Sequence, residues 1–312
     1  MENYKKIYIT DMHCDTIVKC KRKGIDIISN DMHIDLEKIK NTVSLQDFAI
    51  WLDKSYYSRA YDETMECIDF YYEQIEKNKD IIVPVYTYED ILNARKNSKI
   101  AALLSIEGGE AIEGSIEKLE KFYEKGVRLM TLTWNYKNDI GGGAGAWEYG
   151  ISDFGKEVIK HMENMGMIVD VSHLSDKSFW DVVNIAEKPF VASHSNSRSI
   201  CSAKRNLDDD QIKALKDIGG VMGINLYSDF ISDNDTCDIK DVMKHIDYII
   251  ENFGDDIIGF GCDYDGIERT PIGLENASCL SKIIDEIVHR YGVETAEKIA
   301  WKNFDRIFSK LL

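Results

Sequence analysis

The sequence predicts an α/β fold, a closed (β/α)8 barrel of the TIM type that forms a single domain over residues 1–312. The chain has 312 residues, 44% of them hydrophobic, and such barrels typically need about 250 residues in one domain. Short apolar runs alternate with longer amphipathic stretches. Only three prolines occur, and no low-complexity linker or shift in composition marks a domain boundary.

Eight short runs are the expected strands. Several of them are almost continuously apolar, which is typical of parallel strands covered on both faces. They are residues 7–11, 44–51, 100–106, 128–133, 167–171, 190–193, 221–226 and 257–262. The second run is the least clearly marked, because residues 81–86 compete with it as an extra strand or a connector. An open doubly wound sheet is the structural alternative.

Amphipathic stretches between these runs predict the helices. Gly126 and Gly166 stand where two helices should end, and Ser175 and Asp208 are suited to begin two others. The expected helices cover residues 57–78, 115–125, 154–164, 175–186, 208–217 and 241–252, with two more after residue 276. Together with the strands they give about eight βα units, the number that a closed barrel requires.

Charge and cysteine content restrict the partners and the location. The formal net charge of −17 repels phosphate backbones and anionic lipids, so we expect neither nucleic acid nor membrane as a partner. The seven cysteines form no C-x-x-C pair, which argues against a disulfide framework and a structural zinc ribbon. Residues 1–6 do not begin a secretory signal, and no apolar stretch is long enough to span a bilayer. We therefore expect a cytoplasmic location.

Imidazoles and carboxylates follow the candidate strands directly. His13 and Asp15 come after the first strand at i, i+2 spacing, so in an extended segment their side chains point the same way. Because the carboxyl ends of barrel strands converge on one mouth, the whole set should meet there. In chain order the set is His13, Asp15, Glu107, His173, His194 and Asp263.

Three imidazoles and three carboxylates in one place suit a pair of divalent metal ions. A carboxylate shared by two cations holds them about 3.5–4 Å apart, and a water between them becomes a nucleophile near neutral pH. The remaining histidines lie in polar loop or helix contexts, and we give them no role in the site. They are His33, His161, His245 and His289.

Several segments carry motifs in a recognisable order. The first is ITDMHCDT at residues 9–16, which contains D-x-H-x-D-T. The others are SIEG at 105–108, VDVSH at 169–173, ASHS at 192–195, KRNLDD at 204–209, GCDYDG at 261–266 and NFDRIF at 303–308. In this order they resemble the membrane (renal) dipeptidases, peptidase family M19 of the metal-dependent amidohydrolase superfamily. The resemblance covers nearly the whole chain.

The resemblance implies a barrel of the metal-dependent hydrolase type that holds two divalent metal ions, expected to be Zn²⁺. His13 and Asp15 would hold one ion. His173 and His194 would hold the other, and Glu107 would bridge the two.

The same resemblance gives roles to residues around the metals. Asp263 would orient the bridging water and pass its proton to the leaving amine, as a general acid/base. Arg205 would bind the terminal carboxylate of the substrate, because a planar guanidinium pairs with a carboxylate through two hydrogen bonds. Tyr227 matches a family position near that carboxylate. The resemblance is also compatible with a homodimer, although the sequence itself does not encode an oligomeric state.

One position departs from the family pattern. The family usually has a histidine after the fourth strand that contacts the substrate carbonyl, and here Trp134 takes its place. An indole donates one N–H but cannot accept and return a proton, so Trp134 could donate weakly, shape the substrate pocket or mark a lost activity. Losing one oxyanion donor costs about 10²–10³ in rate. Asn135, Tyr136 and Asn138 follow and could supply a substitute donor.

We therefore predict a zinc-dependent dipeptidase that cleaves short peptides with a hydroxide shared by the two metals. By resemblance, a D-residue at the C-terminus of the substrate would be tolerated. An alternative keeps the metals but acts on another small amide, a lactone or an N-acyl amino acid. A third interpretation is a non-catalytic, metal-stabilised binding protein. Glu107 and Asp263 argue against it, because a scaffold does not need water-activating carboxylates.

Overall fold

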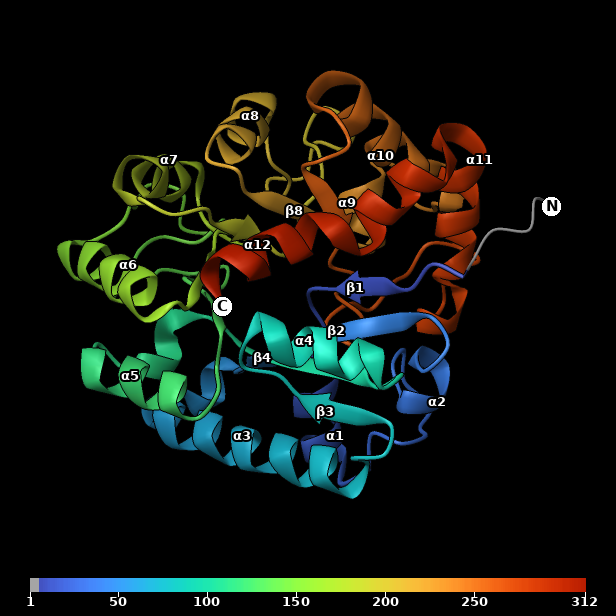
Figure 1. Cartoon of the computed structure of the whole chain (residues 1–312). Coiled ribbons are helices and arrows are strands. Elements are labelled where there is room, and N and C mark those ends of the chain that lie inside the picture. The colour runs from blue at the N-terminus through green and yellow to red at the C-terminus, as the bar shows by residue number, and fades with distance from the viewer. Residues whose placement is uncertain (1–5) are drawn as a thin grey trace.

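Eight parallel strands close into a barrel with helices around it, as the sequence predicted (Figure 1). This computed structural model describes residues 6–312, so the start of the chain, on which we based the prediction of no secretory signal, lies mostly outside the described residues. The barrel strands are β1 (Ile9–Asp11), β2 (Val43–Trp51), β4 (Ile100–Glu107), β5 (Leu129–Thr131), β6 (Ile168–Asp170), β7 (Val191–Ala192), β8 (Val221–Ile224) and β9 (Ile258–Phe260). Because β1 pairs with both β2 and β9, and β2 pairs with β4, the open-sheet alternative is excluded.

A further strand lies beside the barrel. β3 (Ile82–Pro84) pairs with the first residues of β4, whereas β5 pairs with its last residues. The competing segment at residues 81–86 is therefore the extra strand, and the second predicted run does form the second barrel strand. This division works because β4 is long enough to offer the same edge to two neighbours in succession.

The expected helices are present, with bounds that differ from the predicted ones by a few residues. They are α3 (Ala60–Lys77), α5 (Ile116–Glu124), α6 (Asp153–Met165), α7 (Asp176–Ile185), α8 (Asp209–Asp217), α10 (Ile239–Phe253), α11 (Ser281–Glu297) and α12 (Asn303–Leu311). Ser175 caps α7, Asp208 forms a capping box with Gln211 at the start of α8, and Gly166 ends α6 in the left-handed conformation.

Several short elements were not predicted. They are the helices α1 (Thr16–Lys23), α2 (Leu36–Ile39), α4 (Tyr88–Lys96) and α9 (Ser228–Ile231), the 3-10 helices η1 (Lys54–Arg59), η2 (Gly109–Ile112) and η3 (Ala277–Cys279), and the π-helix η4 (Lys298–Lys302). Most of these elements have one or two turns and show too little periodicity to stand out in a sequence, whereas α4 is as long as the predicted α5 and α8. Within residues 6–312, no helix combines the length and apolar character needed to cross a bilayer.

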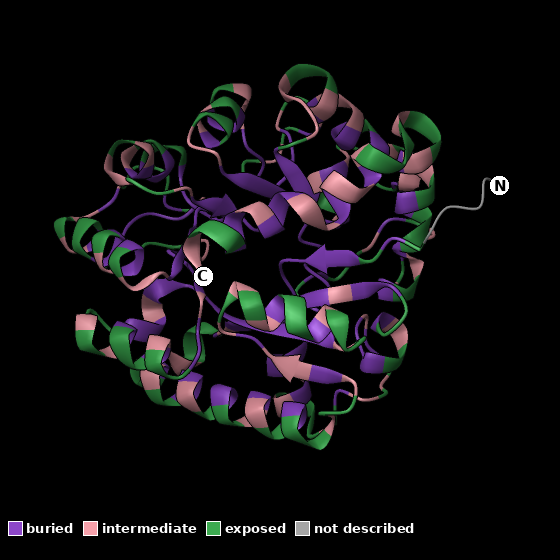
Figure 2. Ribbon diagram, in the orientation of Figure 1, coloured by how far each residue is buried: buried purple, intermediate pink, exposed green. Residues whose placement is uncertain are grey.

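Two helices close the amino-terminal end of the barrel. α4 and α12 contact each other and cross in front of the strands in Figure 1. Phe304 and Phe308 of α12 belong to the same buried apolar cluster as Leu45, Leu103 and Val221 of the strands. Figure 2 shows the strands almost wholly buried and the exposed residues on the outer faces of the helices. With this end filled, the carboxyl ends of the strands are left for a functional site.

His245 of α10 is fully buried, although the sequence suggested polar surroundings. Its Nδ1 accepts a hydrogen bond from the backbone N–H of Ser197 at 3.2 Å, and its Nε2 donates to the carbonyl oxygen of Ile231 at 2.9 Å. Burial lowers the pKa of His245 from 6.5 to about 4, because the charged imidazolium loses its hydration. The folded protein therefore holds this side chain neutral over a range in which the unfolded chain takes up a proton.

The free energy of unfolding should fall as the pH drops from about 6.5 to about 4, by on the order of 3 kcal/mol from His245 alone. His245→Gln offers an acceptor and a donor but does not titrate, so its stability should fall less over the same range. Urea unfolding at both pH values measures the difference, with His289→Gln on the exposed side of α11 as the control. An identical acid loss in wild type and His245→Gln would contradict this assignment.

Candidate metal centre

The carboxyl ends of five barrel strands bring the predicted metal-site side chains together. Each residue is at most 9% exposed, so the cluster is largely shielded from solvent. His13 and Asp15 follow β1, Glu107 is the last residue of β4, and His173, His194 and Asp263 follow β6, β7 and β9. Their meeting at one mouth follows from the parallel barrel, in which every strand points the same way.

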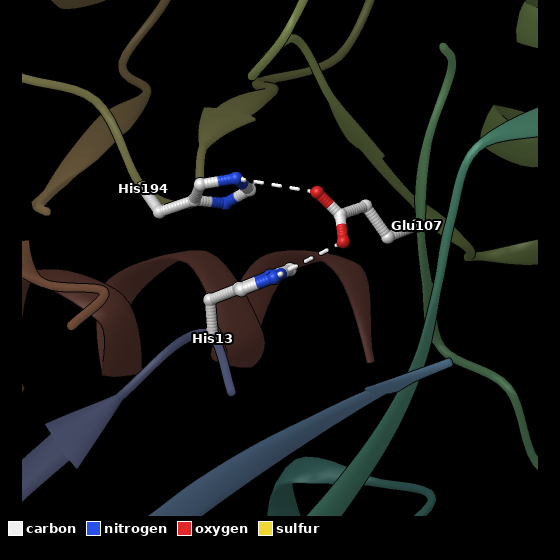
Figure 3. Close-up of side chains that lie close together, drawn as sticks. All are labelled: His13, Glu107 and His194. Carbon is white, nitrogen blue, oxygen red and sulfur yellow. Dashed lines mark ion pairs between the residues drawn. The ribbon is translucent and has the colours of Figure 1, made fainter. Parts of the chain in front are cut away.

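Glu107 lies between the imidazoles. Its Oε2 is 3.5 Å from Nε2 of His13, whereas its Oε1 is 2.7 Å from Nε2 of His173 and 3.6 Å from Nε2 of His194. Figure 3 shows the two carboxylate oxygens turned toward different imidazoles, His13 and His194. A carboxylate arranged in this way is suited to bridge two cations.

Two overlapping groups of ligand atoms each lie within 4.8 Å of one another: His13, Glu107 and His194, and His13, Asp15 and Asp263. In the second group, Nε2 of His13 is 3.6 Å from the Asp15 carboxylate and 3.9 Å from the Asp263 carboxylate. His173 falls outside both groups, yet its Nε2 lies 2.9 Å from Nε2 of His194. The donor set thus offers room for more than one ion.

Two of the imidazoles are held in the tautomer that a metal needs. Nδ1 of His173 lies 2.8 Å from Oδ1 of Asn135, and an amide oxygen only accepts, so Nδ1 carries the proton. The Ser193 hydroxyl donates to Asp170, so it accepts from Nδ1 of His194 at 2.7 Å. Both Nε2 atoms therefore present lone pairs to each other, which repel unless a positive charge lies beside them.

His13 gives a second indication that the cluster fits a cation. It is fully buried, and neither ring nitrogen finds a hydrogen-bond partner among the described residues. Burial disfavours its charged form, but the carboxylates of Glu107 and Asp15 outweigh burial and raise its pKa well above 6.5. The cluster thus attracts positive charge to this position, and the residues fit divalent metal ions of the kind that imidazole and carboxylate bind.

Asn135 orients His173, and its loss should weaken metal binding. Asn135→Leu removes the acceptor at Nδ1, so we expect metal affinity to fall about 10–100-fold. Asn135→Asp keeps an oxygen at the same place and should retain most of the affinity. Competition with a chromophoric chelator measures both variants. Equal affinity in Asn135→Leu and wild type would show that the contact does not orient the imidazole.

Backbone strain is concentrated in this cluster. His173 and Asp263 adopt φ angles of 68° and 60°, in the left-handed region that side chains other than glycine rarely occupy. Asp265, with φ of 69°, accepts hydrogen bonds from the Thr16 hydroxyl and from two backbone N–H groups of the 33–34 segment. At Gly266, a Cβ atom would lie 2.2 Å from both the Asp15 and Asp263 carboxylates, so the close approach requires glycine. Such strain is typical of functional sites.

Asp263 has a neighbour that the sequence analysis did not identify as functional. Nδ2 of Asn225, after β8, donates to Oδ2 of Asp263 at 2.8 Å, while Oδ1 is the atom nearest His13. Burial, reinforced by the Asp15 and Glu107 carboxylates, raises the pKa of Asp263 to about 7. No local motif marks Asn225, because its role depends on the pairing of β8 with β9.

Arg205 and Tyr227 lie on the β7–β8 side of the mouth. Arg205 is buried, and its Nη2 donates to the carbonyl oxygen of His194 at 3.2 Å. Its Nε has no acceptor, and none of the ion pairs formed by the described residues involves it. A buried guanidinium without a carboxylate partner is suited to an anionic group of a ligand. Tyr227 is half-buried at the rim, with its ring 4.9 Å from that of Phe230.

Trp134 follows β5 and lies next to His173. The two ring centroids are 6.3 Å apart, so the indole lines the metal cluster. Of the three suggested substitute donors, Asn138 is used within its own loop, where Nδ2 donates to Leu132 and Oδ1 accepts two backbone N–H groups. Asn135 uses its oxygen on His173, and Tyr136 packs its ring against Trp134.

Sequence comparisons identify the family of the chain. Residues 2–311 match the family described as Membrane dipeptidase (Peptidase family M19). An uncharacterized dipeptidase of Schizosaccharomyces pombe is 32% identical over 299 residues, which cover 89% of this chain and 72% of that protein. An uncharacterized protein in the pqqA 5′ region of Klebsiella pneumoniae is 33% identical over 235 residues, or 71% of this chain and 86% of that protein.

Solved structures share the fold. A metallo peptidase of family M19, dipeptidase AC, superposes with a TM-score of 0.93 at 20% identity, over 98% of this chain and 99% of that one. A metallo peptidase from Rhodobacter sphaeroides, liganded with a phosphinate mimic of L-Ala-D-Ala, gives 0.92 at 20% identity, over 99% and 100%. The chain belongs to the membrane dipeptidase family, peptidase family M19, and is a hydrolase of the metallo-dipeptidase type.

Proposed function

We propose that this chain is a zinc-dependent dipeptidase with two metal ions, and that it hydrolyses the amide bond of a dipeptide whose C-terminal residue has either the L or the D configuration. His13 and Asp15 would hold one ion, His173 and His194 the other, and Glu107 both. Two such ions would acidify a shared water for attack and polarise the scissile carbonyl.

The observation that carries the proposal is the unpaired, buried guanidinium of Arg205 beside the histidine–carboxylate cluster. Arg205 would bind the terminal carboxylate of the substrate and so place the neighbouring amide bond over the cluster. A site that anchors a terminal carboxylate within one residue of the reacting bond selects short substrates. The metallo peptidase from Rhodobacter sphaeroides was solved with a phosphinate mimic of L-Ala-D-Ala, which supports the proposal that a C-terminal D-residue is accepted here.

Asp263 would move the proton. Its Oδ1 faces the cluster while Asn225 holds Oδ2, so the carboxylate is oriented to take a proton from the attacking water and deliver it to the leaving amine. Tyr227 would contact the carboxylate end of the substrate from the rim. Trp134 and Asn135 would border the other end, Asn135 chiefly through His173.

Trp134 favours a second candidate, an amidohydrolase that acts on N-acyl amino acids. Such a substrate keeps the carboxylate for Arg205 but lacks the free amine. The apolar face of an indole can pack against the acyl group of this substrate as well as against the side chain of a dipeptide. The same metal-loaded protein, offered N-acetyl amino acids beside dipeptides, separates the two candidates.

The test of the proposed function is turnover of L,L and L,D dipeptides by zinc-loaded protein, with metal content measured on the same sample. Two ions per chain with cleavage support it. Two ions without cleavage of any dipeptide exclude it in favour of the second candidate or of binding without turnover.

The seven cysteines are all unpaired, which supports the proposal of a reducing, cytoplasmic location. A homodimer and a single domain over the whole chain stay predictions.

A further inference from the structure

Three aromatic side chains stand together at the mouth of the barrel. Trp51 ends β2, and its ring centroid is 5.1 Å from that of Trp134, which in turn is 5.4 Å from that of Tyr136. Trp51 and Trp134 are half-buried and Tyr136 is 42% exposed, so the three rings form a partly open surface. We call Trp51, Trp134 and Tyr136 the aromatic wall.

The aromatic wall borders the metal cluster directly. Trp51 is aligned with Glu107 in the pairing of β2 with β4, and Trp134 lies 6.3 Å from the His173 ring. Around the barrel, the strand order places β2 opposite β7. Arg205 contacts the carbonyl oxygen of His194, just after β7. Trp51 and Arg205 therefore lie on opposite sides of the mouth, and Trp134 and Tyr136, which follow β5, continue the wall toward His173.

Trp51 carries a second indication of a missing partner. Its indole Nε1 is buried, and it finds no acceptor among residues 6–312. Buried indole N–H groups usually have an acceptor, so a backbone carbonyl oxygen of a bound peptide would supply one, while its apolar side chain contacts the rings. This orphan donor is independent of the ring packing and points to the same surface.

We propose that the aromatic wall binds the side chain of the N-terminal residue of the substrate and selects dipeptides that begin with an aromatic or large aliphatic residue. This inference rests on the proposed function, because the carboxylate on Arg205 sets the direction of the dipeptide. With the amide bond over the metals, the first residue extends toward β2 and β5, where the rings offer apolar area.

Two cationic side chains near the aromatic wall could instead favour an acidic first residue in the substrate. The guanidinium of Arg22 lies 5.5 Å from the Trp51 ring, and Nζ of Lys54 lies 3.2 Å from the Tyr136 ring. Both side chains are exposed, so water and salt screen their attraction for an acidic residue, while their charge disfavours a substrate lysine. Burial of apolar area should therefore decide the preference.

The test compares kcat/KM of the metal-loaded protein for Phe-Ala, Leu-Ala, Gly-Ala, Lys-Ala and Glu-Ala. Phe-Ala and Leu-Ala should exceed Gly-Ala and Lys-Ala by about 10-fold or more. In Trp51→Ala and Trp134→Ala, the ratio of Phe-Ala to Gly-Ala should fall by about 10-fold or more. The ratio cancels a general loss of activity. Trp180→Ala, an exposed tryptophan of α7, is the matched control and should keep the wild-type ratio.

Equal values across the panel, or a ratio unchanged in both wall variants, would overturn the inference. Glu-Ala as the best substrate would assign the preference to Arg22 and Lys54 instead, and would overturn it too. If no dipeptide is cleaved, the proposed function fails, but calorimetric binding of Phe-Ala and Gly-Ala still tests the wall. Tighter binding of Phe-Ala that is lost in Trp51→Ala would support it, and equal binding would refute it.

Discussion

Glu107→Ala is expected to lose bound metal and, with it, peptide hydrolysis. The two oxygens of Glu107 face His13 on one side and His173 on the other, at 3.5 and 2.7 Å, so its removal takes a ligand from both proposed ion positions at once. Metal ions contribute several kcal/mol to the transition state, so kcat/KM should fall by more than about 10³-fold. Metal analysis after dialysis and dipeptide turnover measure the two effects.

A second buried glutamate provides the control. Glu163 of α6 accepts hydrogen bonds from the backbone N–H groups of residues 187 and 188, and it is as buried as Glu107. Glu163→Gln should change stability without changing the metal content. If Glu107→Ala still holds two ions per chain, the proposed bridge is wrong, whatever happens to the activity.

The barrel could be predicted because its strands are short, apolar and regularly followed by polar side chains. Parallel strands covered on both faces leave nearly continuous apolar runs, and β4 is the clearest example. The ligand-type residues come within four residues of the strand ends, so their convergence follows from the topology. β3 was harder to assign, because its sequence is as apolar as that of a barrel strand although it pairs only with the first residues of β4.

The residues that orient the site could not be predicted in the same way. Asn135, Asn225 and the Ser193–Asp170 pair act through contacts between different strands or loops, which no local pattern reports. The left-handed backbone at His173 and Asp263 is equally hidden, because only neighbouring structure forces these residues into it.

The roles of Trp134 and Trp51 show the same limit. The sequence identified Trp134 as a departure from a family pattern, but it did not indicate that Trp51, far away along the chain, lies against it. The role of tryptophan at the family's histidine position therefore becomes clear only from its contact with Trp51 of β2. An indole that packs on another indole builds a surface for a side chain, whereas a lone tryptophan would only remove a proton donor.

Asp263→Asn should retain its metals and lose about 10²–10⁴ in kcat, with little change in KM. The amide has the same shape as the carboxylate and can keep an oxygen near Asn225, but it cannot take up or release a proton. Burial raises the pKa of Asp263 to about 7, which suits a group that must do both near neutral pH. Asp263 is also within reach of His13, at 3.9 Å, so metal content has to be measured beside kcat.

The two measurements separate a proton carrier from a ligand. Loss of kcat with two ions still bound assigns proton transfer to Asp263, whereas a parallel loss of metal makes it a ligand of the cluster formed with His13 and Asp15. Asn225→Ala is the companion variant, because Nδ2 of Asn225 donates to Asp263 while its Oδ1 accepts from the backbone N–H of Tyr227 at 2.7 Å. It should lower kcat less than Asp263→Asn does, and the double variant should be no slower than Asp263→Asn alone. Additive losses in the double variant would contradict a shared role and would assign the further loss to the hydrogen bond from Asn225 to the Tyr227 backbone.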